Sequence, residues 1–528
     1  MTGYTLGIEF STQSAKTVVL DLAGANIIHI DSINYDTAFP SYATEGGVLP
    51  SRSTDIRHTS PLMILEALDL SFDKLSKAGI DLAKVKVVKT DGMQHCSVYT
   101  NAQFVAKLKS LDAGTDLKTQ LRGCFSRQTS PIWEDRSTGE QARFLTTALK
   151  NRGSIVNLTG NRAELRFPAA QILKWAMQDS KEYENTKNIF LLSAFVTSLL
   201  CGKTAPVDTG DGWGTNLNNL DIDNPGWSPI VIDLIDNTLR KNSIPSDLAD
   251  KIGKIDHYDA VAGTISSYFS NKYGIHKEAV VLTGTGDNPA TLLGCGGKAV
   301  ISLGSSYTVN GIMKKILPSA DEEYNVFGYT RGKGTSLSVI TNGGKVHEHF
   351  YKTYLHSSDT ATIDWHHYVQ TAGSAVVTER ENILLPYLID ESVPVKKAGL
   401  IRDGFDANDP QKNIRALILS QVLSLKVHAK HLGDIDELCI VGGGGDNELM
   451  MQWIADAFDA RTYKIDNFSS AATLGCAISG AVASLGISYS EAAQRFVKKD
   501  LTSVHTPIPG NRTKMVDLLK RYMELEKR

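Results

Sequence analysis

Cysteine is scarce in this sequence, and its cysteines are not arranged in pairs. Of 528 residues only six are cysteine, and no C-x-x-C motif occurs. Widely spaced cysteines in a large chain argue against a zinc site or a disulfide framework. They favour reduced thiols and therefore a cytoplasmic protein.

An excess of charge of one sign and long apolar runs are also lacking. The 55 basic and 58 acidic residues give a formal net charge of -3, so neither a nucleic acid nor an anionic membrane surface is indicated as a partner. There is no apolar run of the ~18 residues that would predict a membrane span. The first residues also lack the basic and then apolar pattern of a signal peptide. We expect no nucleic-acid partner and no membrane partner.

A strand–turn–strand pattern occurs twice in the chain. Residues 4–22 contain two apolar segments rich in β-forming residues, joined by a polar turn. Residues 298–313 repeat this pattern a little over half the chain length later. The segment I-E-F-S-T-Q at 8–13 can be laid over I-S-L-G-S-S at 301–306. An echo at this distance predicts a duplicated α/β domain instead of a solenoid. We place the hinge near residues 294–298, and the two domains at 1–295 and 296–528.

Several further elements are expected from apolar periodicity and from helix-end signals. The predicted helices are 60–77, 171–177, 189–200, 412–431, 448–458 and 471–485, and the predicted strands include 26–33, 85–90, 96–100 and 437–441.

Three turns made of small polar residues follow apolar strands. Such turns let backbone N–H groups approach phosphate oxygens, and hydroxyls add further donors. Ordinary hairpin turns have the same composition, so each turn alone leaves both interpretations open. The four-glycine turn gives the strongest signal, because it lies between a strand and a helix. The turns are Ser11-Thr12-Gln13, Gly304-Ser305-Ser306 and Gly442–Gly445.

An acidic residue follows a second glycine-rich segment, T-G-T-G at 283–286. Asp287 has the position of a helix N-cap, with Pro289 in the first turn. It also has the position of a carboxylate that faces a glycine-lined cleft and accepts a proton from a hydroxyl group. The residue pattern alone does not decide between these two roles.

A further group of polar residues suits a polyol ligand. Gln94 and His95 follow a strand, Trp133 precedes Glu134 and Asp135, and Arg166 precedes Phe167. A sugar needs several donors and acceptors and an aromatic flank. Each residue taken singly is equally compatible with an ordinary polar position.

Taken together, these segments make the chain similar to the FGGY family of carbohydrate kinases and, within it, to the D-xylulose kinases of the longer, eukaryotic-like type. The resemblance covers nearly the whole chain. The motifs that carry it, in the order of the family, are F-S-T-Q at 10–13 with Lys16, T-E-G-G-V at 44–48, Q-H at 94–95, Trp133 with D-R-S-T at 135–138, L-T-G at 158–160, R-F at 166–167, D-G at 211–212, G-D-N-P-A at 286–290, S-L-G-S-S at 302–306, and G-G at 442–443 with Asn447.

The resemblance implies two ribonuclease H-like domains of the actin-like ATPase type, with an active site in the cleft between them. It implies that the first domain binds a sugar and the second a nucleotide. The residues implied for the sugar are Gln94, His95, Asp135, Arg166, Asp287 and Asn288. Those implied for ATP are Ser11, Thr12, Gln13, Gly304, Ser305, Ser306, Trp365, Gly443, Gly444 and Asn447.

The implied reaction transfers the γ-phosphoryl group of ATP to the 5-hydroxyl of D-xylulose, with Asp287 as the general base. Mg²⁺ would accompany ATP and meet Glu9 and Asp287. Two residues depart from the family pattern, since Glu9 stands where the family has Asp and Cys96 stands where it commonly has Gly. Both departures bear on the rate or on the choice of sugar.

Three alternatives remain open at this point. The first is a sister kinase acting on L-xylulose, ribulose or glycerol. The second is an actin-like ATPase that uses nucleotide for conformational work, and the third is a silent sugar-binding pseudokinase. A homodimer is compatible with any of the kinase assignments.

Overall fold

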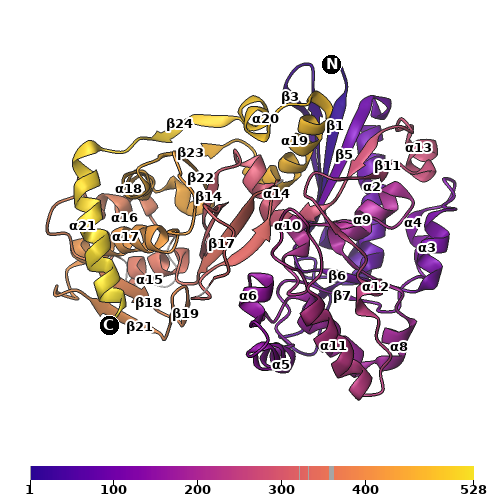
Figure 1. The fold of residues 1–528 in the computed structure, drawn as a ribbon. Helices are drawn as coiled ribbons and strands as arrows, with labels where there is room; N and C mark the ends of the chain where they lie inside the picture. Colours follow the sequence, from indigo (N-terminus) through magenta and orange to yellow (C-terminus); the bar gives the residue numbers. More distant parts are fainter. Residues whose placement is uncertain (1, 320, 331, 356–361) are drawn as a thin grey trace. The chain divides into compact units, whose positions relative to one another are not determined.

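The computed structural model describes residues 2–319, 321–330, 332–355 and 362–528 (Figure 1). Backbone contacts divide the chain into two compact units. Unit 1 comprises Met1–Gly294, Ile316–Thr335 and Ser469–Phe496, and unit 2 comprises Cys295–Lys315, Ser336–Phe468 and Val497–Arg528. The first passage between units, at Gly294 and Cys295, falls in the segment where the sequence indicated a hinge. A single boundary at 295/296 does not describe the division, because two later segments return to unit 1.

The sheet of unit 1 begins as an antiparallel meander. Strands β1 (Tyr4–Phe10), β2 (Ser14–Asp21) and β3 (Asn26–Asn34) pair in sequence order. On its other side β1 pairs in parallel with β5 (Val85–Gly92), which pairs in parallel with β12 (Val280–Leu282). β11 (Val261–Thr264) closes the edge, and β13 (Thr285–Gly286) pairs with the end of β5. The predicted meander is confirmed, and the ends of β1, β5 and β13 lie side by side.

Two helices cover opposite faces of this sheet. Thr90 of β5 contacts α9 (Leu192–Cys201) through Thr197, and the next residue, Asp91, contacts α19 (Ala471–Leu485) through Cys476. Successive residues of a strand point to opposite faces, so the two helices sandwich the strand. A Cβ at Gly7 of β1 would lie 2.0 Å from the carbonyl oxygen of Thr473. Glycine at this position therefore permits the close packing of α19.

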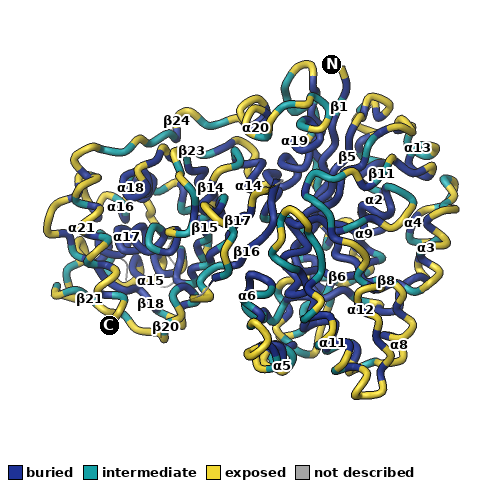
Figure 2. Tube along the Cα trace, in the orientation of Figure 1, coloured by how far each residue is buried: buried dark blue, intermediate teal, exposed yellow. Residues whose placement is uncertain are grey.

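The apolar composition of α19 has a structural explanation. The sequence analysis expected no segment long and apolar enough to span a membrane, but by length and composition Phe468–Leu485 is one. Most of it is nevertheless buried within unit 1, as Figure 2 shows by its dark colour. It is a core helix that contacts β1, β5 and α14 (Asp287–Gly294).

Unit 2 repeats the strand arrangement of unit 1. β14 (Ala299–Leu303) is antiparallel to β15 (Tyr307–Ile312) and parallel to β22 (Glu437–Val441), just as β1 is antiparallel to β2 and parallel to β5. This shared pairing supports the predicted duplication. From β17 (Gly334–Ile340) onward the order in this sheet is β17, β15, β14, β22, β23 (Arg461–Ile465) and β24 (Lys499–His505). Helices α17 (Pro410–Val427), α18 (Glu448–Phe458) and α21 (Pro509–Glu526) contribute to the core of unit 2.

Most predicted elements are confirmed, and two are partly wrong. The helix expected over 412–431 ends already at Val427, as α17. The ranges 437–441, 448–458 and 471–485 match β22, α18 and α19, and α2 (Pro61–Lys77) begins after its N-cap Ser60. The range 189–200 was expected to be entirely helical. Its start instead belongs to strand β8 (Asn188–Leu191), which pairs with β6 (Ser97–Thr100), and α9 begins only at Leu192. A short apolar run fits either structure, and the pairing partner β6 decides between them.

Candidate functional site

Gln94, Asp287 and Asn288 form one hydrogen-bonded cluster in unit 1, called here the Gln94 cluster. The Asn288 amide donates to Gln94 Oε1 (2.6 Å) and to Asp287 Oδ1 (2.9 Å). Gln94 Nε2 donates in turn to the carbonyl oxygen of Gly210 (3.0 Å). A Cβ at Gly286 would lie 2.4 Å from Gln94 Cγ, so the glycine makes room for Gln94 beside Asp287. The structure therefore brings these three predicted residues together.

His95 is held as a neutral hydrogen-bond acceptor. Its Nδ1 lies 2.7 Å from the carbonyl oxygen of Gly214, and a carbonyl only accepts, so Nδ1 carries the proton. Burial and the nearby Arg166 guanidinium hold the pKa of His95 well below its usual value. The ring stacks on Phe167 with centroids 4.3 Å apart. Its Nε2 lone pair is therefore available to a hydroxyl donor.

Arg166 lies close to His95 and to the carboxyl group of Glu164. Its guanidinium donates to Asn325 Oδ1 (3.3 Å). Burial alone would raise the pKa of Glu164, but the charges of Arg166 and Arg162 hold it below its usual value. Arg166 is therefore a fixed positive charge beside the neutral His95.

Asp135 has a different environment from the Gln94 cluster. Its Oδ1 accepts from Ser137 and from Gln171 Nε2 (2.7 Å), and its Oδ2 accepts from the Arg57 amide (3.0 Å). Burial alone would raise the pKa of Asp135, but hydrogen bonds from His58, Ser137 and Gln171 hold it well below its usual value. Both oxygens are in use within the fold, which favours a structural role. Its predicted sugar contact stays a prediction.

Three carboxyl groups lie at the adjoining ends of β1, β5 and β13. Glu9 is in register with Asp91, and Asp91 with Thr285, two residues before Asp287. Burial, followed by the charges of Glu9 and Asp287, raises the pKa of Asp91 well above its usual value. Burial and the charge of Glu9 raise the pKa of Asp287 to about 7. Asp287 is thus a carboxylate whose proton affinity suits proton transfer near neutral pH.

The sequence analysis missed Asp91, although an acid in an apolar strand was a usable signal. Asp91 is fully buried; Cys476 Sγ donates to its Oδ2 (3.3 Å), and its Oδ1 has no hydrogen-bond partner. Glu9 is better satisfied, since Lys16 Nζ lies 3.3 Å away and Thr473 Oγ1 donates to it (2.6 Å). Lys16 thus pairs with Glu9 on the adjacent strand.

These carboxyl groups suit a divalent cation that keeps other ligands. Among the described residues, no group of three or more His, Cys, Asp or Glu is placed to hold a metal ion alone. Mg²⁺ usually takes only one or two carboxylates, with water and phosphate oxygens completing its shell. The unpartnered oxygen of Asp91 and the raised pKa of Asp287 mark a place where positive charge would be stabilising.

The first predicted phosphate turn is braced by two neighbouring segments. Trp133 Nε1 donates to Thr12 Oγ1 (2.9 Å), and Ser11 Oγ donates to the carbonyl oxygen of Ser14 (2.9 Å). A Cβ at Gly47 would lie 1.8 Å from the carbonyl oxygen of Thr12. Gln13 is exposed next to them. The close approach of Gly47 to the Thr12 carbonyl explains why a glycine is needed at position 47 beside this turn.

Unit 2 contains a cavity of about 640 Å³, called here the glycine-rich pocket. Its volume lies within the range of ordinary small-molecule sites. Six of the residues predicted to bind ATP line it, and Ser306 is not among its lining residues. The six are Gly304, Ser305, Trp365, Gly443, Gly444 and Asn447.

Backbone geometry explains the glycines of the turn at 442–445, two of which, Gly443 and Gly444, line this pocket. Gly442 has φ +87°, and a Cβ there would lie 2.8 Å from the carbonyl oxygen of Leu303. A Cβ at Gly444 would lie 2.7 Å from Leu303 Cβ. Asn447 then caps α18, since its Oδ1 accepts from the Met450 amide (3.0 Å). The turn thus lies directly against the end of β14.

Aromatic residues form another part of the pocket lining. Trp365 is 46% exposed and meets Tyr368 edge to face, with centroids 5.7 Å apart. The sequence analysis missed His347, whose two ring nitrogens lie 2.9 Å and 3.0 Å from the hydroxyls of Tyr368 and Tyr307. Burial lowers the pKa of His347 to about 4, so it is a neutral bridge between the two tyrosines.

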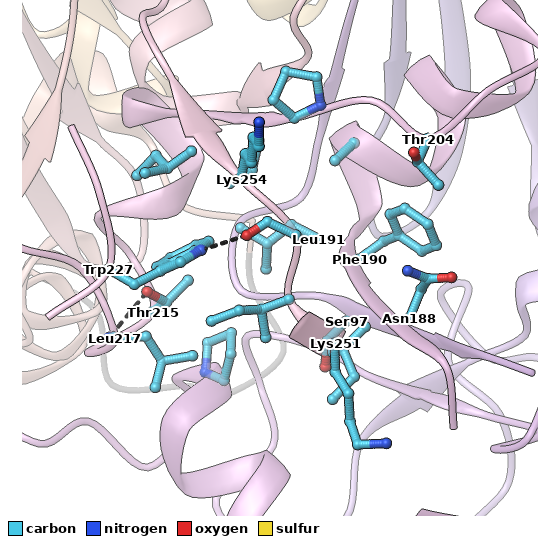
Figure 3. A pocket seen from close by; sticks show the side chains of 18 of the residues that line it. Ser97, Asn188, Phe190, Leu191, Thr204, Thr215, Leu217, Trp227, Lys251 and Lys254 are labelled. Atoms are coloured by element: carbon cyan, nitrogen blue, oxygen red, sulfur yellow. Dashed lines mark hydrogen bonds between the residues drawn. The ribbon is translucent and has the colours of Figure 1, made fainter. Parts of the chain in front are cut away.

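A second cavity, of about 400 Å³, lies in unit 1 and contains none of the predicted site residues (Figure 3). Its lining is largely apolar, with Phe190 and Trp227 among the labelled side chains. Trp227 Nε1 donates to the carbonyl oxygen of Gly253 (2.8 Å), and Thr215 Oγ1 accepts from the Leu217 amide (3.1 Å). The Trp227 indole and the Thr215 hydroxyl therefore already have hydrogen-bond partners within the fold.

Comparisons with known proteins agree with these observations. Residues 299–484 match the model of the C-terminal domain of the FGGY family of carbohydrate kinases. A xylulose kinase of Rattus norvegicus is 32% identical over 99% of this chain and 96% of the relative. Xylulose kinase 2 of Arabidopsis thaliana is 33% identical over 90% of this chain and 86% of the relative. The solved xylulose kinase of Rhodospirillum rubrum has the same fold, with a TM-score of 0.79 at 13% identity, covering 99% of this chain and 98% of that one.

Proposed function

Since the chain belongs to the FGGY family of carbohydrate kinases, we propose that it transfers the γ-phosphoryl group of ATP to the 5-hydroxyl of D-xylulose. The observation that carries the proposal is the Gln94 cluster, in which a carboxylate with a pKa of about 7 lies beside side-chain amides suited to a polyol. The relatives at 32% and 33% identity are xylulose kinases, which supports a ketopentose as the substrate.

On the sugar side, Asp287 accepts the proton of the 5-hydroxyl while the oxygen attacks the γ-phosphorus and ADP leaves. Gln94, Asn288 and the Nε2 of His95 offer donors and acceptors to the other hydroxyl groups. Arg166 adds a fixed positive charge beside His95. Asp135 supports this region through its hydrogen bonds with Ser137 and Gln171.

On the nucleotide side, the glycine-rich pocket takes the adenosine part of ATP. Gly443 and Gly444 expose backbone to the ligand, Asn447 begins α18, and Trp365 offers an aromatic face. Turns Ser11-Thr12-Gln13 and Gly304-Ser305-Ser306 supply N–H and hydroxyl donors for phosphate oxygens. Catalysis then depends mainly on positioning and charge, because the transferred group resembles metaphosphate.

Glu9 and Asp287 are the residues proposed to face Mg²⁺, with the unpartnered Asp91 oxygen close to both. When bound with ATP, Mg²⁺ neutralises phosphate charge. The cytoplasmic location and a homodimer stay predictions.

The direct experiment measures ADP release by the purified protein with ATP and Mg²⁺. The sugars are D-xylulose, L-xylulose, D-ribulose, L-ribulose and glycerol, with a sample that lacks sugar as the baseline. We expect D-xylulose to give the highest kcat/KM. A higher kcat/KM for another polyol would show that this polyol is the substrate. ADP release at the same rate with and without every sugar would favour an ATPase that uses nucleotide for conformational work.

The pH dependence should follow the raised pKa of Asp287. A base must be deprotonated, so kcat/KM should fall by about tenfold per pH unit below a midpoint near 7 and level off above it. A divalent cation beside a carboxylate lowers its pKa, so the kcat profile should have a lower midpoint. Initial rates between pH 5.5 and 8.5 test this, and a flat kcat/KM profile would remove Asp287 as the titrating base.

Shortening Glu9 should leave an active enzyme. In Glu9→Asp the carboxylate retreats by about one bond length from Thr473 and Lys16, but its charge stays at the end of β1. We expect kcat within about tenfold of the unmodified protein and a higher Mg²⁺ requirement. Mg²⁺ titrations of the rate measure both, and complete inactivity would show that the longer side chain is required.

A further inference from the structure

Lys89 is a fully buried lysine on the strand that leads to Gln94, and the proposed reaction gives it no role. It lies on β5, five residues before Gln94, and has 0% exposure. Its ammonium donates to the carbonyl oxygens of Tyr258 and Thr283, at 2.7 Å each. Asp208 Oδ2 lies 3.9 Å away, and the centroid of the Tyr258 ring is 4.1 Å from Nζ.

Two of these partners, Thr283 and Asp208, lead to residues proposed to act on the sugar. Thr283 begins the short segment that passes through β13 to Asp287. Asp208 caps α10 (Thr209–Gly212), since its Oδ1 accepts from the Asp211 amide (2.9 Å). The Gly210 carbonyl on α10 then accepts from Gln94, and the Gly214 carbonyl just after it accepts from His95. One ammonium group therefore joins three segments that carry or hold Gln94, His95 and Asp287.

The cost of burying this charge makes a merely space-filling role a poor explanation. Desolvating an ammonium costs several kcal/mol, and an apolar side chain of the same volume often replaces a buried ion pair without loss of stability. Asp208 Oδ2 has no hydrogen-bond partner, so the ion pair is not fully satisfied. The ammonium group instead holds two carbonyl groups, those of Tyr258 and Thr283, and the Asp208 carboxylate around itself.

We propose that Lys89 is a positioning residue, which holds the segment leading to Asp287 and the α10 segment in register with Gln94 and His95. This inference rests on the proposed function. Displacing reacting groups by about 1 Å can cost as much as 10²-fold in rate. Loss of the ammonium should therefore impair use of the sugar and leave the glycine-rich pocket intact, because that pocket belongs wholly to unit 2.

The test compares Lys89→Met with Lys251→Met. Lys251 is a matched control, because it is also buried in unit 1, donates to a carbonyl oxygen (Thr186, 2.5 Å) and lies 5.2 Å from a tyrosine ring centroid. It has no hydrogen bond to the Gln94 cluster or to α10 among the contacts of the described residues. Both variants should lower Tm.

Only Lys89→Met should change the kinetics per folded molecule. We expect kcat/KM for D-xylulose to fall by roughly 10- to 100-fold, through both kcat and KM, while the KM for ATP stays unchanged. In Lys251→Met both constants should match the unmodified protein. Equal kinetics in the two variants, with only Tm lowered, would overturn the inference.

Asp208→Asn keeps the proposal testable if Lys89→Met fails to fold. The amide oxygen can still cap α10, but the negative charge facing Lys89 is lost. We expect kcat/KM for D-xylulose to fall by roughly 2- to 30-fold, with the KM for ATP unchanged. An unchanged kcat/KM would contradict the role of Lys89. Failure of the proposed function would look different, since the unmodified protein would then show no D-xylulose-dependent ADP release.

Discussion

Replacing Asp287 with asparagine is expected to lower kcat by about 10²- to 10⁴-fold, the usual contribution of a positioned general base. The amide keeps the size of the side chain but cannot take the proton of the sugar hydroxyl. Asp287 lies in unit 1, whereas the glycine-rich pocket lies in unit 2, so ATP affinity should change little. Coupled ADP detection gives the rates, and titration with a fluorescent ATP analogue gives the affinity.

Asp236→Asn is a suitable control for this variant. Asp236 is a buried carboxylate of the same unit, and it accepts from Ser246 Oγ (2.5 Å) and from the Leu248 amide (3.2 Å). Its replacement should lower Tm and leave kcat unchanged. A kcat for Asp287→Asn equal to that of the unmodified protein would remove Asp287 from the mechanism.

Replacing Gly442 with alanine is expected to weaken ATP binding by roughly 5- to 150-fold. This range corresponds to the ~1–3 kcal/mol that a side chain costs in a sparsely populated backbone conformation. Gly442 has φ +87°, and the new Cβ would meet three backbone atoms of Leu303 between 2.8 Å and 3.2 Å. The turn must therefore move away from the end of β14, which changes the glycine-rich pocket. Calorimetric titration with ATP measures the loss.

Gly445→Ala separates conformational strain from the mere loss of a glycine. Gly445 lies in the same turn as Gly442 but has no positive φ and does not line the pocket, and a Cβ there would make only ordinary contacts, at 3.5 Å from Ile440 and Lys464. We expect a much smaller loss of ATP affinity in this variant. If Gly442→Ala bound ATP as tightly as the unmodified protein, the turn would not shape the nucleotide site.

The parts of the site that the sequence revealed are those encoded in short segments. Small polar turns after apolar strands, and a glycine pair before Asp287, need no long-range information to be recognised. The ranges of β22, α18 and α19 were also predictable, because glycine or asparagine marks their ends and their apolar pattern is clear. The repeated hairpin indicated the duplicated domain, and the matching strand pairing supports it.

The parts that the sequence did not reveal depend on contacts between distant residues. Lys89 and Asp91 are ordinary polar residues in a strand until Thr283, Asp208 and Cys476 are placed against them. Asp135 appeared suited to a sugar, but its oxygens are used by residues that only the fold brings near. The first residues of the predicted helix at 189–200 form a strand because β6 provides a pairing partner. None of these outcomes is encoded within one segment.

The return of the chain to unit 1 after residue 468 has a consequence for its synthesis. Helix α19 supplies the Thr473 hydroxyl to Glu9 and the Cys476 thiol to Asp91, and it covers one face of β1 and β5. Domains usually fold from the N-terminus as they leave the ribosome, but here that face stays bare until nearly the whole polypeptide has been made. A fragment ending at residue 295 would lack this cover, so the N-terminal half cannot complete its own core without the C-terminal half.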